Sequence, residues 1–91
     1  MNASPLGTEI RRARTKLGLS LQALSEATAQ FTTDGQPIPV RTIHGMETGE
    51  ALRPHERALR PVAEVLAPET NMQRLALLAY GEDPAQLLVA I

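Results

Sequence analysis

Apolar residues recur at intervals of three and four along most of this 91-residue chain, in segments that are separated by glycine or proline. This spacing places the apolar side chains on one face of an α-helix. No stretch alternates apolar and polar residues over more than a few positions, as a half-buried strand would. The sequence therefore predicts an all-α fold of five to six short helices.

Two helices are predicted before residue 32. Ser4-Pro5 is a cap residue followed by proline at the first helical position, and Gly18 is expected to end that helix in a left-handed conformation. Ser20 is expected to cap the second helix after one intervening residue. The side chains predicted to face inward are Leu6, Ile10, Ala13 and Leu17 in the first helix and Leu21, Leu24, Ala27, Thr28 and Phe31 in the second.

A long connection is expected between the second and third helices. Residues 29–37, AQFTTDGQP, contain an Asp-Gly turn signal, and the two prolines nearby forbid a continuous helix. Pro39 can open a third helix over about residues 39–48, which Gly49 is expected to end. The connection could be a flexible flap, an extension of the second helix or an extra wing. A wing is least favoured, because the segment has one acid and no base.

The remaining chain is expected to form two or three helices. A fourth covers about residues 55–66, with Leu59, Val62, Ala63 and Leu66 facing inward. Pro61 removes one backbone hydrogen bond, so it should kink this helix or move its start towards Ala58. Thr70 to Gln73 resemble a capping box for a fifth helix that Gly81 ends, and Asp83-Pro84 should start a last short helix.

An ordered set of motifs resembles the lambda-repressor-like (Xre-type) helix-turn-helix family over about residues 6–67. The matching residues are Arg14, Leu17-Gly18-Leu19-Ser20, Leu24-Ser25, Ile43, Met46, Glu47, Gly49, Pro54, Leu59, Val62, Ala63 and Leu66. The resemblance implies a DNA-binding domain at residues 1–67, with a lengthened connection between its second and third helices. Residues 68–91 would then be a C-terminal helical extension.

The resemblance also implies which face of the third helix contacts DNA. With Ile43 and Met46 in the core, the opposite face would enter the major groove. The implied base contacts are Val40, Arg41, His44 and Gly45, and the implied backbone contacts are Thr42, Thr48, Arg53 and His55. Arg41 is the strongest candidate, because a guanidinium can donate two hydrogen bonds to guanine. Alternatively, Arg41 and His44 are simply solvated.

An ion pair between Arg14 and Glu47 is a further implication of the resemblance. A carboxylate beside an apolar stripe needs a cation or a raised pKa, and a two-pronged pair would hold the first and third helices at one angle. Alternatively, Glu47 is a solvated residue at the end of the third helix.

Arg11, Arg12 and Lys16 are expected to form a solvated face of the first helix.

Charge is distributed unevenly, although the net charge is −1. Residues 1–60 hold eight of the nine Lys and Arg residues and six acids, whereas residues 61–91 hold one base and four acids. An anionic partner is therefore expected to bind the first two-thirds of the chain.

Several classes of protein are disfavoured by the composition. The absence of cysteine excludes disulfides and thiolate metal sites, and no apolar run approaches the roughly 20 residues of a membrane span. No catalytic set of acids, Ser/His/Asp residues or glycine-rich phosphate loop is present, so neither an enzyme nor a cofactor is expected. Without the charge pattern of a signal peptide, a cytoplasmic location is expected, on the nucleoid when DNA is bound.

The leading hypothesis is a sequence-specific regulator of transcription that binds double-stranded DNA, such as a small bacterial or phage repressor. A homodimer could form through Leu75, Leu78, Leu87, Leu88 and Ile91, or these residues could close the core of a monomer. An antitoxin whose acidic C-terminal third binds a toxin would keep the same DNA-binding domain. A helical adaptor that binds proteins instead of DNA is the third hypothesis.

Overall fold

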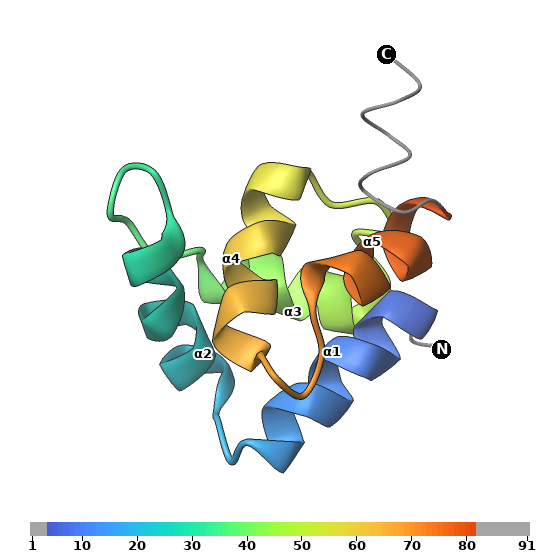
Figure 1. Cartoon of the computed structure of the whole chain (residues 1–91), viewed down its shortest axis with the longest axis horizontal. Coiled ribbons are helices and arrows are strands. Elements are labelled where there is room, and N and C mark those ends of the chain that lie inside the picture. The colour runs from blue at the N-terminus through green and yellow to red at the C-terminus, as the bar shows by residue number, and fades with distance from the viewer. Residues whose placement is uncertain (1–3, 82–91) are drawn as a thin grey trace.

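The protein is built from short helices that pack across one another around a single core (Figure 1). The computed structural model describes residues 4–81. They form α1 (Pro5–Lys16), α2 (Leu21–Thr28), the 3₁₀ turn η1 (Ala29–Phe31), α3 (Val40–Thr48), α4 (Glu56–Leu66) and α5 (Met72–Tyr80), and no strand. The all-α prediction is confirmed for this part of the chain. The last predicted helix, at Asp83-Pro84, lies outside the described residues.

Local signals set the ends of α1 and the start of α2 as predicted. The Ser4 hydroxyl accepts a hydrogen bond from the Gly7 amide at 3.0 Å. At the other end Gly18 has a φ of +73°, and the amides of Gly18 and Leu19 donate back to carbonyls of the last turn. Ser20 caps α2 by accepting from the amide three residues later at 3.0 Å. These ends follow from side-chain and backbone chemistry within a few residues.

The core combines the apolar faces of α1 to α5, with α1 against α3 and α5, and α2 against α3 and α4. Two residues predicted to face inward are instead exposed, Leu17 by 38% and Phe31 by 43%, and Leu21 and Ala27 are half-buried. Leu17 follows the last residue of α1, and Phe31 lies in the 3₁₀ turn, so neither keeps the α-helical period. The buried apolar residues are Leu6, Ile10, Ala13, Leu24, Ile43, Met46, Leu59, Val62, Ala63, Leu66, Met72, Leu75, Ala76 and Ala79.

The connection between α2 and α3 is an ordered, hydrogen-bonded loop. One 3₁₀ turn continues α2, and the Thr32 hydroxyl then donates to the Gln36 carbonyl at 2.9 Å. The Ile38 amide donates to the Thr28 hydroxyl at 2.8 Å, and the Ser25 hydroxyl donates to the Ile38 carbonyl at 2.6 Å. The structure thus combines a short extension of α2 with a loop that is tied back to α2, rather than a free flap.

Pro61 lies inside α4, and the helix starts at Glu56, close to the predicted residue 55, rather than near Ala58, which was one of the two effects expected of the proline. His55 supplies the reason, since its Nδ1 accepts a hydrogen bond from the Arg57 amide at 3.0 Å and so caps the first turn. Proline removes a single donor from the helix, and Pro61 itself is buried in the core. The cap and the burial together hold the first turn in place.

The cap of α5 is Asn71 and not Thr70. The Asn71 side-chain oxygen accepts from the Arg74 amide at 2.8 Å, whereas Thr70 is only 2% exposed and belongs to the preceding turn. The expected capping box is therefore displaced by one residue. The helix ends at Gly81, as predicted.

α5 shares the core of the preceding helices, because it packs against α1 and α4. Leu75, proposed for a dimer interface, is completely buried within the monomer, so that assignment is wrong for this residue. Leu78 is half-buried, and Leu77 is the exposed leucine of this helix at 47%. Leu87, Leu88 and Ile91 lie outside the described residues.

Candidate nucleic-acid interface

α3 buries one face and exposes the other. Ile43 and Met46 are completely buried, and Glu47 beside them is 4% exposed. The opposite face carries exposed Arg41, His44 and Thr48, and half-buried Val40 and Thr42 lie at its two borders. Five of the eight predicted DNA-contacting residues therefore lie along the accessible side of this helix.

Gly45 is the exception among the predicted base contacts. A Cβ atom at this position would lie 3.8 Å from the Glu50 carboxylate and 3.9 Å from the Ala51 side chain. The Gly45 carbonyl also accepts a hydrogen bond from the Ala51 amide at 3.0 Å. Gly45 is buried because the chain folds back over it after α3, so the prediction that it contacts a base is wrong.

An ion pair with two hydrogen bonds joins α1 to the C-terminal end of α3. Arg14 Nε lies 2.7 Å from Glu47 Oε2, and Arg14 Nη2 lies 3.0 Å from Glu47 Oε1. The Arg14 guanidinium also donates to the Leu19 carbonyl at 2.9 Å, and Arg11 lies 3.6 Å from the same carboxylate. The hydrogen bond to Glu47 raises the pKa of Arg14. The structure thus contains the pair that the resemblance implied.

Gly7 allows α1 to approach α3 closely at the same junction. A Cβ atom on Gly7 would lie 2.4 Å from the Glu47 carbonyl oxygen and 2.6 Å from that of Met46, closer than side chains tolerate. Sequence reasoning missed this contact. The only local signal was a glycine near the start of a helix, where it lowers helix propensity without a benefit visible in the sequence.

Arg53 and His55 follow α3 and also have structural roles. The Arg53 guanidinium lies over the Tyr80 ring at 5.6 Å, and the Tyr80 hydroxyl donates to the Pro54 carbonyl at 2.6 Å. His55 caps α4 through Nδ1, so the neutral ring carries its proton on Nε2 and can still donate from there. Both side chains are exposed, and α5 and α4 fix their positions.

A second ion-pair network lies between α1 and α5. Arg12 donates two hydrogen bonds to the carboxylate of Glu9, at 3.1 and 3.0 Å, and Arg74 lies 3.0 Å from the same carboxylate. Arg12 also donates to the Glu69 carbonyl at 2.7 Å. The hydrogen bond from Arg12, assisted by the Arg74 charge and opposed by burial, lowers the pKa of Glu9 to about 2. Arg12 is exposed, as expected for this face of α1, and in addition links α1 to α5 through Glu9 and Glu69.

The ion pairs divide the nine basic residues, all of which lie within residues 4–81, into two groups. Arg11, Arg12, Arg14, Arg60 and Arg74 each pair with a carboxylate. The other four, Lys16, Arg41, Arg53 and Arg57, form no ion pair with a described acid. Three of these four fall between residues 41 and 57. The unpaired cations are thus concentrated from α3 to the start of α4, a stretch in which Glu50 is the one acid without a described ion pair.

Within residues 4–81, no three His, Asp or Glu side chains are grouped closely enough to hold a metal ion. No helix in this range has the length and apolar character needed to cross a membrane.

Comparison with known protein families, with curated proteins and with solved structures found no match for this chain.

Proposed function

We propose that this protein is a sequence-specific, double-stranded-DNA-binding regulator of transcription, of the lambda-repressor-like (Xre-type) helix-turn-helix class. In this proposal α2 and α3 form the helix-turn-helix unit, and α3 is the recognition helix. The ion pair of Arg14 with Glu47 supports the proposal, since it attaches α3 to α1 while leaving the opposite face of α3 accessible.

The observation that carries the proposal is the position of the free positive charge. Arg41 lies in the first turn of α3, Arg53 in the following loop and Arg57 in the first turn of α4, and none pairs with a described acid. Two exposed histidines, His44 and His55, lie in the same stretch. Nucleic-acid affinity depends on the local density of such cations, so a net charge of −1 is compatible with DNA binding.

Arg41 is the side chain best suited to recognise a base. It is exposed at the start of α3, the part of a recognition helix that contacts base edges. A guanidinium that donates to O6 and N7 of guanine provides about 1–3 kcal/mol of discrimination against other bases. Val40, which is half-buried beside it, offers an apolar contact for a thymine methyl group. His44 could donate to a base edge one turn later.

Phosphate contacts would come from the polar residues that border this face. Thr48 is exposed at the end of α3, and the Tyr80 ring holds the Arg53 guanidinium in place. Such contacts position the protein on the duplex but carry no sequence information. In this proposal Arg41 therefore provides sequence specificity, and the border residues provide affinity for the DNA backbone.

Selection of bound molecules from random duplex DNA by the purified full-length protein tests the proposal. We expect enrichment of a short consensus whose binding weakens steeply as the salt concentration rises. A two-fold-symmetric consensus would further support a homodimer. Absence of enrichment at low salt would contradict DNA binding and favour the protein-interaction adaptor.

A single substitution then tests the recognition face. Arg41→Ala should reduce discrimination at one base pair by about 5- to 150-fold, the equivalent of about 1–3 kcal/mol, with little loss of stability. Arg74→Ala removes the same charge from α5 and should retain the wild-type consensus. Unchanged discrimination in Arg41→Ala would show that α3 does not contact bases through this residue.

A further inference from the structure

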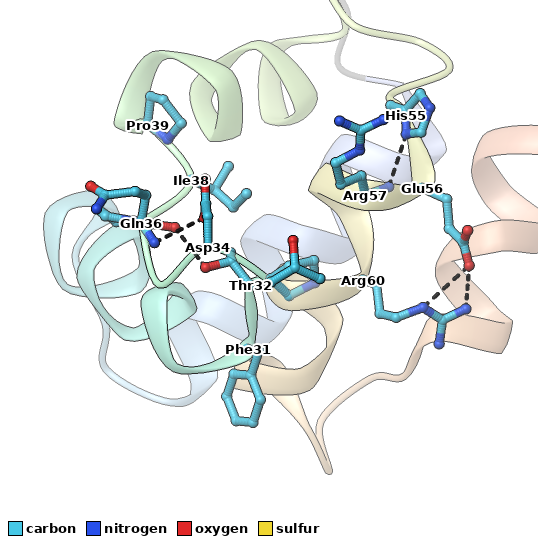
Figure 2. A pocket seen from close by; sticks show the side chains of 13 residues that line it. Phe31, Thr32, Asp34, Gln36, Ile38, Pro39, His55, Glu56, Arg57 and Arg60 are labelled. Atoms are coloured by element: carbon cyan, nitrogen blue, oxygen red, sulfur yellow. Dashed lines mark hydrogen bonds and ion pairs between the residues drawn. The ribbon is translucent and has the colours of Figure 1, made fainter.

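A groove runs between the loop that connects α2 to α3 and the first turns of α4 (Figure 2). Its volume is about 560 Å³. A second cavity of about 300 Å³, which we call the hollow, shares Ile38, His55 and Arg57 with this groove and is also lined by Ala58. The hollow adjoins the start of α3, because Ile38 lies two residues before Val40.

The lining of the hollow has a polar part, formed by Arg57 and His55, and an apolar part, formed by Ile38 and Ala58. Arg57 is exposed and forms no ion pair with a described acid, and the neutral ring of His55 can donate from Nε2. Ile38 and Ala58 are half-buried apolar residues. No acid lines the hollow, whereas the lining of the groove includes Asp34 and Glu56.

The two acids of the larger groove are already engaged. Figure 2 shows Glu56 joined to Arg60, on the side of α4 away from the loop. Asp34 accepts a hydrogen bond from the Gln36 amide at 3.0 Å within the loop itself. An anion in the hollow would therefore meet Arg57 without displacing a carboxylate from it.

We propose that the hollow binds one phosphate and the adjoining deoxyribose of a DNA strand, beside the bases contacted by α3. This inference rests on the proposed function and extends it to a segment of the chain. A sugar–phosphate backbone alternates an anionic group with an apolar ring, and the hollow offers a guanidinium and an imidazole N–H beside an apolar wall. Arg57 donates to the phosphate oxygens, and the deoxyribose packs on Ile38.

The ordered loop holds Ile38 in a fixed position for this contact. Hydrogen bonds from Ile38 to Thr28 and from Ser25 to Ile38 fix the apolar wall to α2, so little conformational entropy is lost on binding. The loop would then contribute to DNA binding through the apolar side chain of Ile38 and not through a charged side chain. The proposed footprint therefore extends beyond the base pairs that α3 reaches.

The salt dependence of binding to the selected duplex tests this contact. Removal of one phosphate contact should lower the slope of log K against log salt concentration by about 1. For Arg57→Gln we expect this change and a loss of affinity on the order of tenfold at 0.1 M salt, equal for all base sequences. Arg57 is exposed, so the fold should be retained, which circular dichroism checks.

Arg74→Gln is the matched control. It removes one positive charge from α5, which lies on the opposite side of the molecule from the loop (Figure 1). A slope for Arg57→Gln equal to that of the wild type, or an equal loss of slope in Arg74→Gln, would overturn the inference. Failure of the wild-type protein to bind any duplex would instead refute the proposed function, so the two failures are distinguishable.

Discussion

Single atoms determine how closely neighbouring segments can approach a helix, and Gly7 in α1 and Gly45 in α3 differ in this respect. At Gly7 a Cβ atom would collide with backbone oxygens of α3, the nearest at 2.4 Å. At Gly45 it would find ordinary contact distances of 3.8 to 4.0 Å. Both residues are buried within helices, so burial by itself does not identify the glycine that the fold requires.

Alanine substitution at the two glycines should therefore have opposite effects on stability. Gly45→Ala should stabilise the fold by roughly 0.5–1 kcal/mol, because alanine loses less backbone entropy than glycine in a helix. Gly7→Ala should destabilise it by about 1–3 kcal/mol or more, since backbone atoms have to move. Urea unfolding of both variants measures the difference. A Gly7→Ala variant as stable as the wild type would contradict the close approach.

Between elements, the pair of Arg14 with Glu47 is the main polar link of α1 to α3. The Glu47 side chain is 3% exposed and that of Arg14 is 14% exposed, so both charges have lost most of their hydration. Two direct hydrogen bonds compensate for this desolvation only while both partners are present. The exposed pair of Glu56 with Arg60 on α4 provides a comparison, since its side chains are 54% and 48% exposed.

Glu47→Ala should lower the free energy of unfolding by about 3–5 kcal/mol, because it leaves a mostly buried guanidinium without its acid. Glu56→Ala should lower it by less than about 1 kcal/mol, because solvent screens the exposed pair. Thermal unfolding of the two variants provides the measurement. If Glu47→Ala melts at the wild-type temperature, the pair does not hold the helices together.

At the scale of the whole molecule, the carboxylate of Glu9 connects the first and last described helices. It is 6% exposed and interacts with Arg12 on α1 and Arg74 on α5, and Arg12 also reaches the turn before α5 through Glu69. These interactions hold α5 against α1.

Stability should fall in acid as Glu9 becomes protonated. Its pKa in the folded state, about 2, lies below the ordinary value of 4.5. The ionised carboxylate therefore stabilises the folded state above about pH 4.5, and this contribution is lost as the pH falls towards 2. We expect a change on the order of 2 kcal/mol, reduced from the full shift because both arginines are about half exposed.

Urea unfolding at several pH values between 5 and 2 measures this change. The Glu9→Gln variant is the control, because it cannot ionise at this position and should lose less stability over the same interval. Equal acid sensitivity of variant and wild type would show that Glu9 does not supply the pH dependence.

Local sequence signals predicted most of the helices and their ends. Ser4, Ser20, Gly18 and Gly81 act through contacts within a few residues, so their effects can be recognised without a tertiary structure. The predicted cap was wrong at α5, where the neighbouring residue has this role. Asn71 rather than Thr70 caps α5, and the His55 cap holds the start of α4 despite Pro61.

The sequence by itself determined the helical class, the principal core faces and the exposed polar side of α3, because each depends on periodicity along one segment. Only the tertiary structure decided that Gly45 is covered, that Gly7 touches α3 and that Leu75 is internal. It alone also showed which cations remain free, through the partners of Glu9 and Glu47. The physical reason is that close approach and charge pairing depend on residues distant in sequence, whose positions are set only when the helices pack.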